Sequence, residues 1–176
     1  MGSHTLVLGI GNTLLADEGA GIHALDYLRT QLPEIPGVDY IDGGTLSFTL
    51  AGVIEDADNL IVLDAAQLGL PPGAVRCLTG EAMDRFLGKG KQSVHEVGLV
   101  DLMDIARLTD AFPEQRALIG IQPETLGWGE APSIRVSKAF PEVAACALEL
   151  IERWTPGVAT SKKVDIDQGG CSGSGM

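Results

Sequence analysis

Short apolar runs alternate with helical patterns along this chain, and this alternation constrains the fold most. The run from Leu60 to Leu63 is continuous, as a central parallel strand requires when both of its faces are covered. Strands are predicted at residues 5–11, 38–41, 59–64, 74–78 and 117–121, and helices at 17–32, 46–54, 94–108 and from Pro141 onward. The pattern predicts an α/β fold, a three-layer α/β/α sandwich. Its twisted, mostly parallel sheet has about five strands, with helices on both faces.

Two helix starts carry clear local signals. Ser93 and Glu96 have the spacing of a capping box, which predicts a helix that begins near Val94 and runs to about Leu108. Pro141 is a residue favoured in a first helical turn. A chain of 176 residues suits one domain. We expect a single domain over residues 1–155 and a mobile, Gly/Ser-rich tail over residues 156–176.

Charge and composition exclude several classes of function. The chain has 12 basic and 24 acidic residues, a formal net charge of −12, and such a surface repels nucleic-acid phosphates. No apolar run approaches the roughly 20 residues of a membrane-spanning helix. The three cysteines form no C-x-x-C pair, which favours reduced thiols. We expect a cytoplasmic protein with no nucleic-acid partner and no membrane insertion, monomeric when free.

Polar clusters directly follow three of the predicted strands. They are residues 12–18, residues 42–45 and Asp64. Ligands of open α/β sheets bind beyond the carboxyl ends of the strands, so these clusters are the candidate site. Gly9 and Gly11 begin a dinucleotide fingerprint, but Leu14 stands where its last glycine is needed, so the sequence favours a tight turn over a nucleotide site.

Glu18, Asp64 and His95 are the candidate catalytic and metal-binding residues. Taken singly, each has a simpler explanation: a helix-start acid, a turn-capping acid and a helix-start histidine. A helix N-terminus disfavours imidazolium, so His95 should stay neutral, the form that binds metal. Together the three predict an open metal site. Two oxygen ligands and one nitrogen ligand do not select among Zn, Ni, Mn and Fe.

Five segments resemble, in order, the motifs of the [NiFe]-hydrogenase maturation endopeptidases. They span residues 9–21 (GIGNTLLADEGAG), 42–45 (DGGT), 62–65 (VLDA), 93–99 (SVHEVGL) and 120–124 (GIQPE). The resemblance covers roughly residues 5–154. Glu96 stands where glutamine is often found in the family, and the capping box accounts for it.

The resemblance implies a function and a site. Such proteins cut a short carboxy-terminal extension from the large-subunit precursor of a [NiFe] hydrogenase after nickel insertion. Their metal-binding Glu, Asp and His correspond to Glu18, Asp64 and His95. The metal would be nickel, which the substrate subunit can supply. We expect the peptide groove to be lined by Asp17, Asp42, Gly43, Gly44 and Thr45.

Several alternatives stay open at this point. Nickel can serve as a recognition tag, as a Lewis acid, or as an activator of water, and one carboxylate can instead act as a general base. A non-catalytic nickel-sensing chaperone of the precursor would use the same ligands. An α/β hydrolase of a small metabolite would use the same carboxylates.

Overall fold

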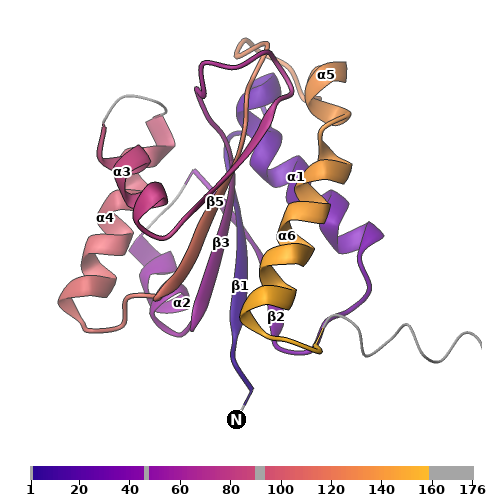
Figure 1. Cartoon of the computed structure of the whole chain (residues 1–176). Coiled ribbons are helices and arrows are strands. Elements are labelled where there is room, and N and C mark those ends of the chain that lie inside the picture. Colours follow the sequence, from indigo (N-terminus) through magenta and orange to yellow (C-terminus); the bar gives the residue numbers. More distant parts are fainter. Residues whose placement is uncertain (1, 46–47, 90–93, 159–176) are drawn as a thin grey trace, which may run out of the picture.

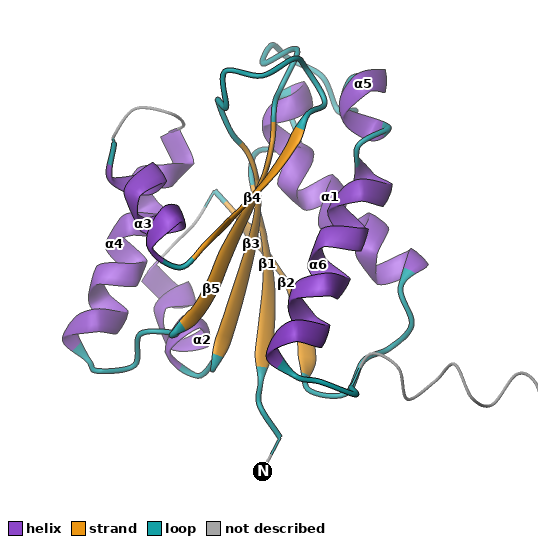
Figure 2. Cartoon of the chain, in the orientation of Figure 1, coloured by secondary structure: helices purple, strands orange, loops and turns teal. Residues whose placement is uncertain are grey.

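A single five-stranded sheet forms the centre of the molecule (Figures 1 and 2). The computed structural model describes residues 2–45, 48–89 and 94–158. The strands follow the order β2-β1-β3-β5-β4. The pairs β1–β2, β1–β3 and β3–β5 are parallel, and β4 is an antiparallel edge strand beside β5. Their bounds are Thr5–Ile10 (β1), Val38–Gly44 (β2), Asn59–Ala65 (β3), Val75–Thr79 (β4) and Gln115–Ile121 (β5).

Helices cover both faces of the sheet, which confirms the predicted three-layer arrangement (Figure 1). One face carries α1 (Ala20–Gln31), α5 (Ile134–Ser137) and α6 (Phe140–Trp154). The other carries α2 (Ala51–Glu55), α3 (Glu81–Gly88) and α4 (Val94–Leu108). Two 3₁₀ turns, η1 (Ala16–Gly19) and η2 (Phe48–Leu50), precede α1 and α2. Among the described helices, none is long and apolar enough to span a membrane.

Strand β3 shows why this sequence makes three layers. Every residue of β3 is buried, and alternate side chains point to opposite faces. Ile61 and Leu63 join the core cluster beneath α1 and α6, whereas Leu60 and Val62 join the cluster beneath α2 and α4. Burial of each such side chain contributes about 1.5–3 kcal/mol, so a run that is apolar on both faces is stable only between two helical layers.

The structure corrects three details of the predicted elements. Strand β2 does not end at Ile41 but continues to Gly44, because Gly44 pairs with Ile10 after a register shift and accepts a hydrogen bond from Gly11 N–H at 2.8 Å. The first helix begins with the 3₁₀ turn η1 in place of an α-helical turn. Helix α3 was not predicted; it is short, and only Met83 and Leu87 are buried on its inner face.

Some predictions fall outside the described residues. These are the start of the helix predicted at 46–54, the Ser93 half of the capping box, and the tail beyond residue 158. The described remainder agrees with the sequence in two places: α4 begins at Val94, and α6 has Pro141 in its first turn.

Candidate active site

The candidate site lies where the chain connections diverge from the centre of the sheet. The chain leaves β1 through α1 to reach β2, and then passes through α2 on the opposite face to reach β3 on the other side of β1. In open α/β sheets, ligands bind at such a switch point, beyond the carboxyl ends of the two strands; we name this place the β1–β3 crevice. Glu18 follows β1 in η1, and Asp64 is the penultimate residue of β3. Both predicted carboxylates therefore belong to the β1–β3 crevice.

Two glycines allow the backbone to pack tightly at this crevice. Gly11 has φ of +145°, and a Cβ atom there would lie 2.2 Å from the carbonyl oxygen of Glu18. A Cβ atom on Gly21 would lie 2.2 Å from the Leu63 carbonyl oxygen and 2.3 Å from that of Ile10. Any larger residue would push η1 and the start of α1 away from the strand ends. These glycines of the first motif thus seat Glu18 over the end of β1.

Asp64, an acidic residue next to the end of a buried strand, is only 2% exposed. By strand alternation it shares a face with Leu60 and Val62, which pack beneath α2 and α4. A carboxylate so deeply buried is costly unless a cation, a proton or hydrogen-bond donors compensate it. Glu18, in η1 after β1, is half-buried. This environment suits a functional acid better than a solvated turn cap.

His95 is the second residue of α4, as the sequence predicted. Figure 1 shows that α4 begins at the end of the sheet toward which the parallel strands run. The side chain of His95 is outside the described part of the structure. Among the side chains that are described, no three His, Cys, Asp or Glu gather closely enough to hold a metal ion. The triad therefore stays a prediction, and its donor set of two carboxylates and an imidazole suits nickel as well as zinc.

Asp17 does not line a groove. It is 0% exposed, and it does not cap its own helix, because the residue at the N-terminal boundary of α1 is Gly19. Its carboxylate accepts four hydrogen bonds, from the N–H groups of Glu124 (2.8 Å), Thr125 (2.9 Å) and Ser133 (2.6 Å) and from the Ser133 hydroxyl (2.8 Å). Burial acts to raise the pKa of Asp17, but these donors outweigh burial and hold the pKa below its ordinary value.

Backbone hydrogen bonds continue this attachment along the loop between β5 and α5. Ala16 N–H donates to the Gly129 carbonyl at 2.7 Å, and Gly129 N–H donates to the Leu14 carbonyl at 3.0 Å. Asp17 N–H donates to the Thr125 carbonyl at 3.0 Å. Residues 124–133 are therefore fastened to the segment that carries Glu18. The sequence alone could not reveal this role for Asp17, since its partners lie more than 100 residues away.

The second motif lies at the carboxyl end of β2, beside β1. Asp42 and Thr45 are exposed, and Asp42 Oδ1 accepts a hydrogen bond from Gly44 N–H at 2.8 Å. Gly44 has φ of +52°, and a Cβ on Gly43 would meet the Leu8 side chain at 2.9 Å. The motif forms a tight turn with little bulk, which is compatible with its predicted place in a peptide groove.

Gln122 gives the fifth motif a structural role that the sequence did not indicate. Its side chain is 7% exposed and its Oε1 accepts a hydrogen bond from Leu68 N–H at 2.7 Å. The backbone of Gln122 also exchanges hydrogen bonds with Gly73 and Ala74. It thereby holds the loop that follows Asp64.

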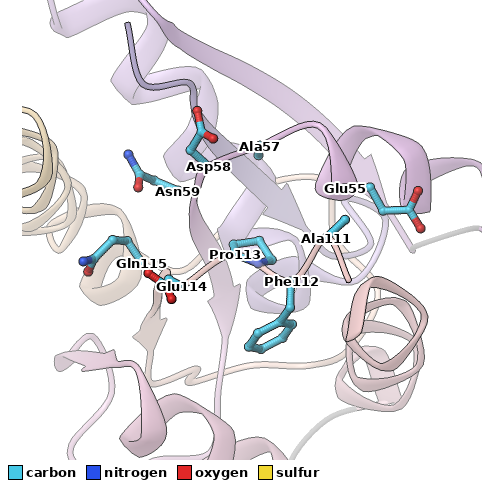
Figure 3. Close-up of a pocket in the computed structure, with 9 residues that line it drawn as sticks. All are labelled: Glu55, Ala57, Asp58, Asn59, Ala111, Phe112, Pro113, Glu114 and Gln115. Carbon is cyan, nitrogen blue, oxygen red and sulfur yellow. The ribbon is translucent and has the colours of Figure 1, made fainter. Parts of the chain in front are cut away.

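A pocket of about 360 Å³ opens at the opposite end of the sheet (Figure 3). It is lined by residues around the starts of β3 and β5, among them Glu55, Asp58, Phe112 and Glu114. Asp58 and Glu114 are exposed, and Glu55 accepts a hydrogen bond from the Thr109 hydroxyl at 3.0 Å. The pocket contains no residue of the five motifs, and it lies at the amino ends of the strands, away from the crevice.

Known proteins share both the sequence and the fold. A family model described as hydrogenase maturation protease (HycI) matches residues 22–153. The hydrogenase expression/formation protein HoxM of Cupriavidus necator is 39% identical over 150 residues, 85% of this chain and 74% of the relative. The hydrogenase 2 maturation protease of Escherichia coli is 37% identical over 149 residues, 83% of this chain and 87% of the relative.

Solved structures give the same result. The hydrogenase maturating endopeptidase HybD of E. coli superposes with a TM-score of 0.80 at 30% identity, over 86% of this chain and 93% of that one. The [NiFe] hydrogenase maturation protease HybD of Thermococcus kodakarensis superposes with a TM-score of 0.72 at 26% identity, over 84% and 98%. With a family model that spans most of the domain and a crevice that carries the expected acids, the chain belongs to the hydrogenase maturation protease family.

Proposed function

We propose that this protein is the endopeptidase that removes the carboxy-terminal extension of a [NiFe]-hydrogenase large-subunit precursor after nickel insertion. The observation that carries the proposal is Asp64, a carboxylate 2% exposed at the β1–β3 crevice of a chain in this family. Glu18 lies at the same crevice, and α4 brings the backbone of His95 to the same end of the sheet. We place the reaction in the cytoplasm, with a monomeric enzyme.

In this proposal nickel belongs to the substrate. Glu18, Asp64 and His95 bind the ion that the precursor carries, so that only a loaded precursor is held in place for cleavage. Bound nickel can supply a Lewis acid for the scissile carbonyl or for a water molecule. The tight backbone packing at Gly11 and Gly21 keeps Glu18 in position before the substrate arrives, which limits the entropy lost on binding.

The carboxylates also suit the proton transfers of hydrolysis. Water adds to the scissile carbonyl, the peptide C–N bond breaks, and the new amino terminus takes up a proton. A carboxylate at the crevice can accept the proton that the water loses, as a general base. If Asp64 takes this role in place of a direct bond to nickel, its burial favours proton transfer because it excludes competing bulk water.

Purified protein, incubated with nickel-loaded or nickel-free precursor, provides the test. Intact-mass spectrometry should show loss of the extension from the loaded precursor and no loss from the nickel-free precursor. Stable binding of loaded precursor with no mass loss would show a chaperone instead. Isothermal titration with nickel, with and without precursor, should show that affinity rises when the precursor is present, and His95→Ala should abolish that rise.

A further inference from the structure

Three large apolar side chains are exposed on two segments that hydrogen-bond to each other, one of which continues to Glu18. Leu14 is 52% exposed, Leu126 49% and Trp128 86%. We name these three residues the apolar strip. An exposed tryptophan is unusual, since an indole ring buries much apolar area when it finds a partner, and clustered exposed apolar residues mark interaction sites.

The strip is made by two segments that lie side by side although they are far apart in the sequence. Leu14 precedes η1, whereas Leu126 and Trp128 lie in the loop after β5 (Figure 1). The two segments pair through Gly129, which follows Trp128 and donates to the Leu14 carbonyl at 3.0 Å. Thr125, which precedes Leu126, bonds both the backbone and the carboxylate of Asp17.

The backbone beneath the strip is fixed before any partner binds. The buried carboxylate of Asp17 holds the loop at Glu124, Thr125 and Ser133 with donor–acceptor distances of 2.6–2.9 Å. Side chains on such a support lose little backbone entropy when they are covered. Binding hot spots have this character: a rigid aromatic anchor, often tryptophan, at the centre of a small contact.

We propose that the apolar strip binds the hydrogenase large-subunit precursor through an apolar segment next to the bond that is cut. This inference rests on the proposed function. Leu14 is four residues before Glu18, and the Leu14 segment is hydrogen-bonded to Gly129, so the strip is near enough for a substrate chain that reaches Glu18 to contact it. A second copy of this protein is disfavoured as the occupant. Each copy carries a net charge of −12, and three apolar residues are far fewer than the roughly 20–30 residues a side of a stable interface.

Steady-state cleavage of nickel-loaded precursor provides the first measurement. Trp128→Ala should raise KM about tenfold and leave kcat within a factor of two. Leu108→Ala is the matched control, because Leu108 is 88% exposed at the far end of α4, and its KM should equal that of the wild type. If wild-type protein cleaves the precursor and Trp128→Ala cleaves it with unchanged KM, the strip has no role. If the wild type does not cleave, the proposed function itself fails.

Fluorine NMR of protein labelled with 5-fluorotryptophan provides a readout that does not depend on turnover. The chain has two tryptophans, Trp128 and the half-buried Trp154 of α6, and Trp154→Phe assigns their signals. Unlabelled precursor should shift or broaden the Trp128 signal and leave the Trp154 signal in place. An unchanged Trp128 signal with saturating loaded precursor would contradict the proposal. So would a Trp128 shift that grows with protein concentration alone and accompanies a dimer in sedimentation, since the occupant would then be a second copy.

Discussion

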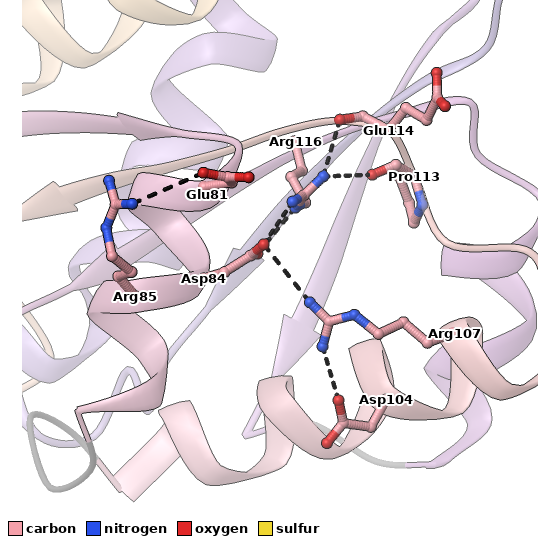
Figure 4. A network of polar contacts seen from close by, with 8 residues as sticks. All are labelled: Glu81, Asp84, Arg85, Asp104, Arg107, Pro113, Glu114 and Arg116. Carbon is pink, nitrogen blue, oxygen red and sulfur yellow. Dashed lines mark hydrogen bonds and ion pairs between the residues drawn. The ribbon is translucent and has the colours of Figure 1, made fainter.

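Two carboxylates, Asp17 and Asp84, are stabilised in opposite ways. Asp17, at the crevice, accepts four hydrogen bonds from uncharged donors in the loop after β5, and within the described residues it has no charged donor. Asp84 of α3 is bonded through both oxygens by the guanidinium of Arg116 on β5, with Arg116 Nε 2.9 Å from Asp84 Oδ1, and it lies 3.6 Å from the guanidinium of Arg107 on α4 (Figure 4). Hydrogen bonding to Arg116 is the main reason that the pKa of Asp84 is lowered.

The surroundings of Asp17 and Asp84 differ in their net charge. At Asp84 two cations offset the carboxylate, and the guanidinium carbons of Arg107 and Arg116 also lie 4.2 and 4.5 Å from the centre of the Phe112 ring. Asp104 also pairs with Arg107 at 2.8 Å, so two acids balance two guanidiniums in this cluster, which joins α3, α4 and β5. At Asp17 the described donors are neutral, so the carboxylate keeps its negative charge. The crevice thereby favours a cation, whereas the Asp84 cluster is already neutralised.

Replacement of Asp17 should have the largest effect. Asp17→Ala leaves three part-buried N–H groups and a hydroxyl without their acceptor, and should lower the free energy of unfolding by about 3 kcal/mol. Precursor cleavage should fall at least tenfold under conditions where the variant is still folded, because the loop no longer supports the segment of Glu18. Urea denaturation and a cleavage assay measure the two effects. Asp26→Asn, an exposed acid on α1, is the control and should change neither. Full cleavage activity in folded Asp17→Ala would show that the loop after β5 is not needed to position Glu18.

Asp84→Asn should have a smaller effect, on stability alone. It removes the charge partner of Arg116, whose side chain is 12% exposed, and should lower the free energy of unfolding by about 2 kcal/mol. Glu81→Gln offers a matched control on the same helix, because its contact with Arg85 is 3.8 Å long and largely exposed; its cost should be near zero. Urea denaturation compares the two variants. Cleavage by Asp84→Asn should stay within twofold of the wild type, and a larger loss would mean that the cluster supports the site.

Acid should lower the free energy of unfolding through both Asp17 and Asp84. The folded-state pKa values of Asp17 and Asp84 are lowered, so each stabilises the protein fully above the unfolded pKa, about 3.9. That stabilisation is lost as pH falls through the folded pKa. The free energy of unfolding, measured with urea from pH 6 down to pH 3, should decrease below about pH 4. The decrease should be shallower in Asp17→Asn and in Asp84→Asn, and an unchanged slope in either variant would show that its carboxylate is not linked to folding.

Salt should produce the smallest effect and should distinguish the two regions. At 1 M NaCl the Debye length falls to about 3 Å, which screens the partly exposed Asp84 pairs but not the neutral hydrogen bonds of Asp17. The stability difference between wild type and Asp84→Asn should shrink by a few tenths of a kcal/mol. The difference between wild type and Asp17→Asn should stay constant. If salt reduced both stability differences equally, the partners of Asp84 and of Asp17 would not differ in charge as described.

The sequence predicted the elements whose signals are local. The apolar run of β3, the start of α4 at Val94 and Pro141 in the first turn of α6 were correct because each depends on neighbouring residues. Strand β2 was predicted too short, since glycines normally end a strand, and here pairing with β1 extends it.

The candidate site also combines residues with local sequence signals and a residue whose role depends on distant parts of the chain. The positions of Glu18 and Asp64 at strand ends followed from the pattern, and the family resemblance named them together with His95. The role of Asp17 could not be read from the sequence. Its hydrogen-bond partners are 107 to 116 residues away, and only the folded chain brings them to it.

Cleavage of nickel-loaded precursor by Asp64→Asn tests whether Asp64 is needed for the reaction. This variant keeps the size of the side chain and replaces the carboxyl group of Asp64 with an amide. Intact-mass spectrometry over a time course should show the extension lost from precursor with wild-type protein and with the Asp26→Asn control. With Asp64→Asn, cleavage should slow by at least a hundredfold while circular dichroism shows the folded protein unchanged. Cleavage by folded Asp64→Asn at the wild-type rate would show that Asp64 is not part of the active site.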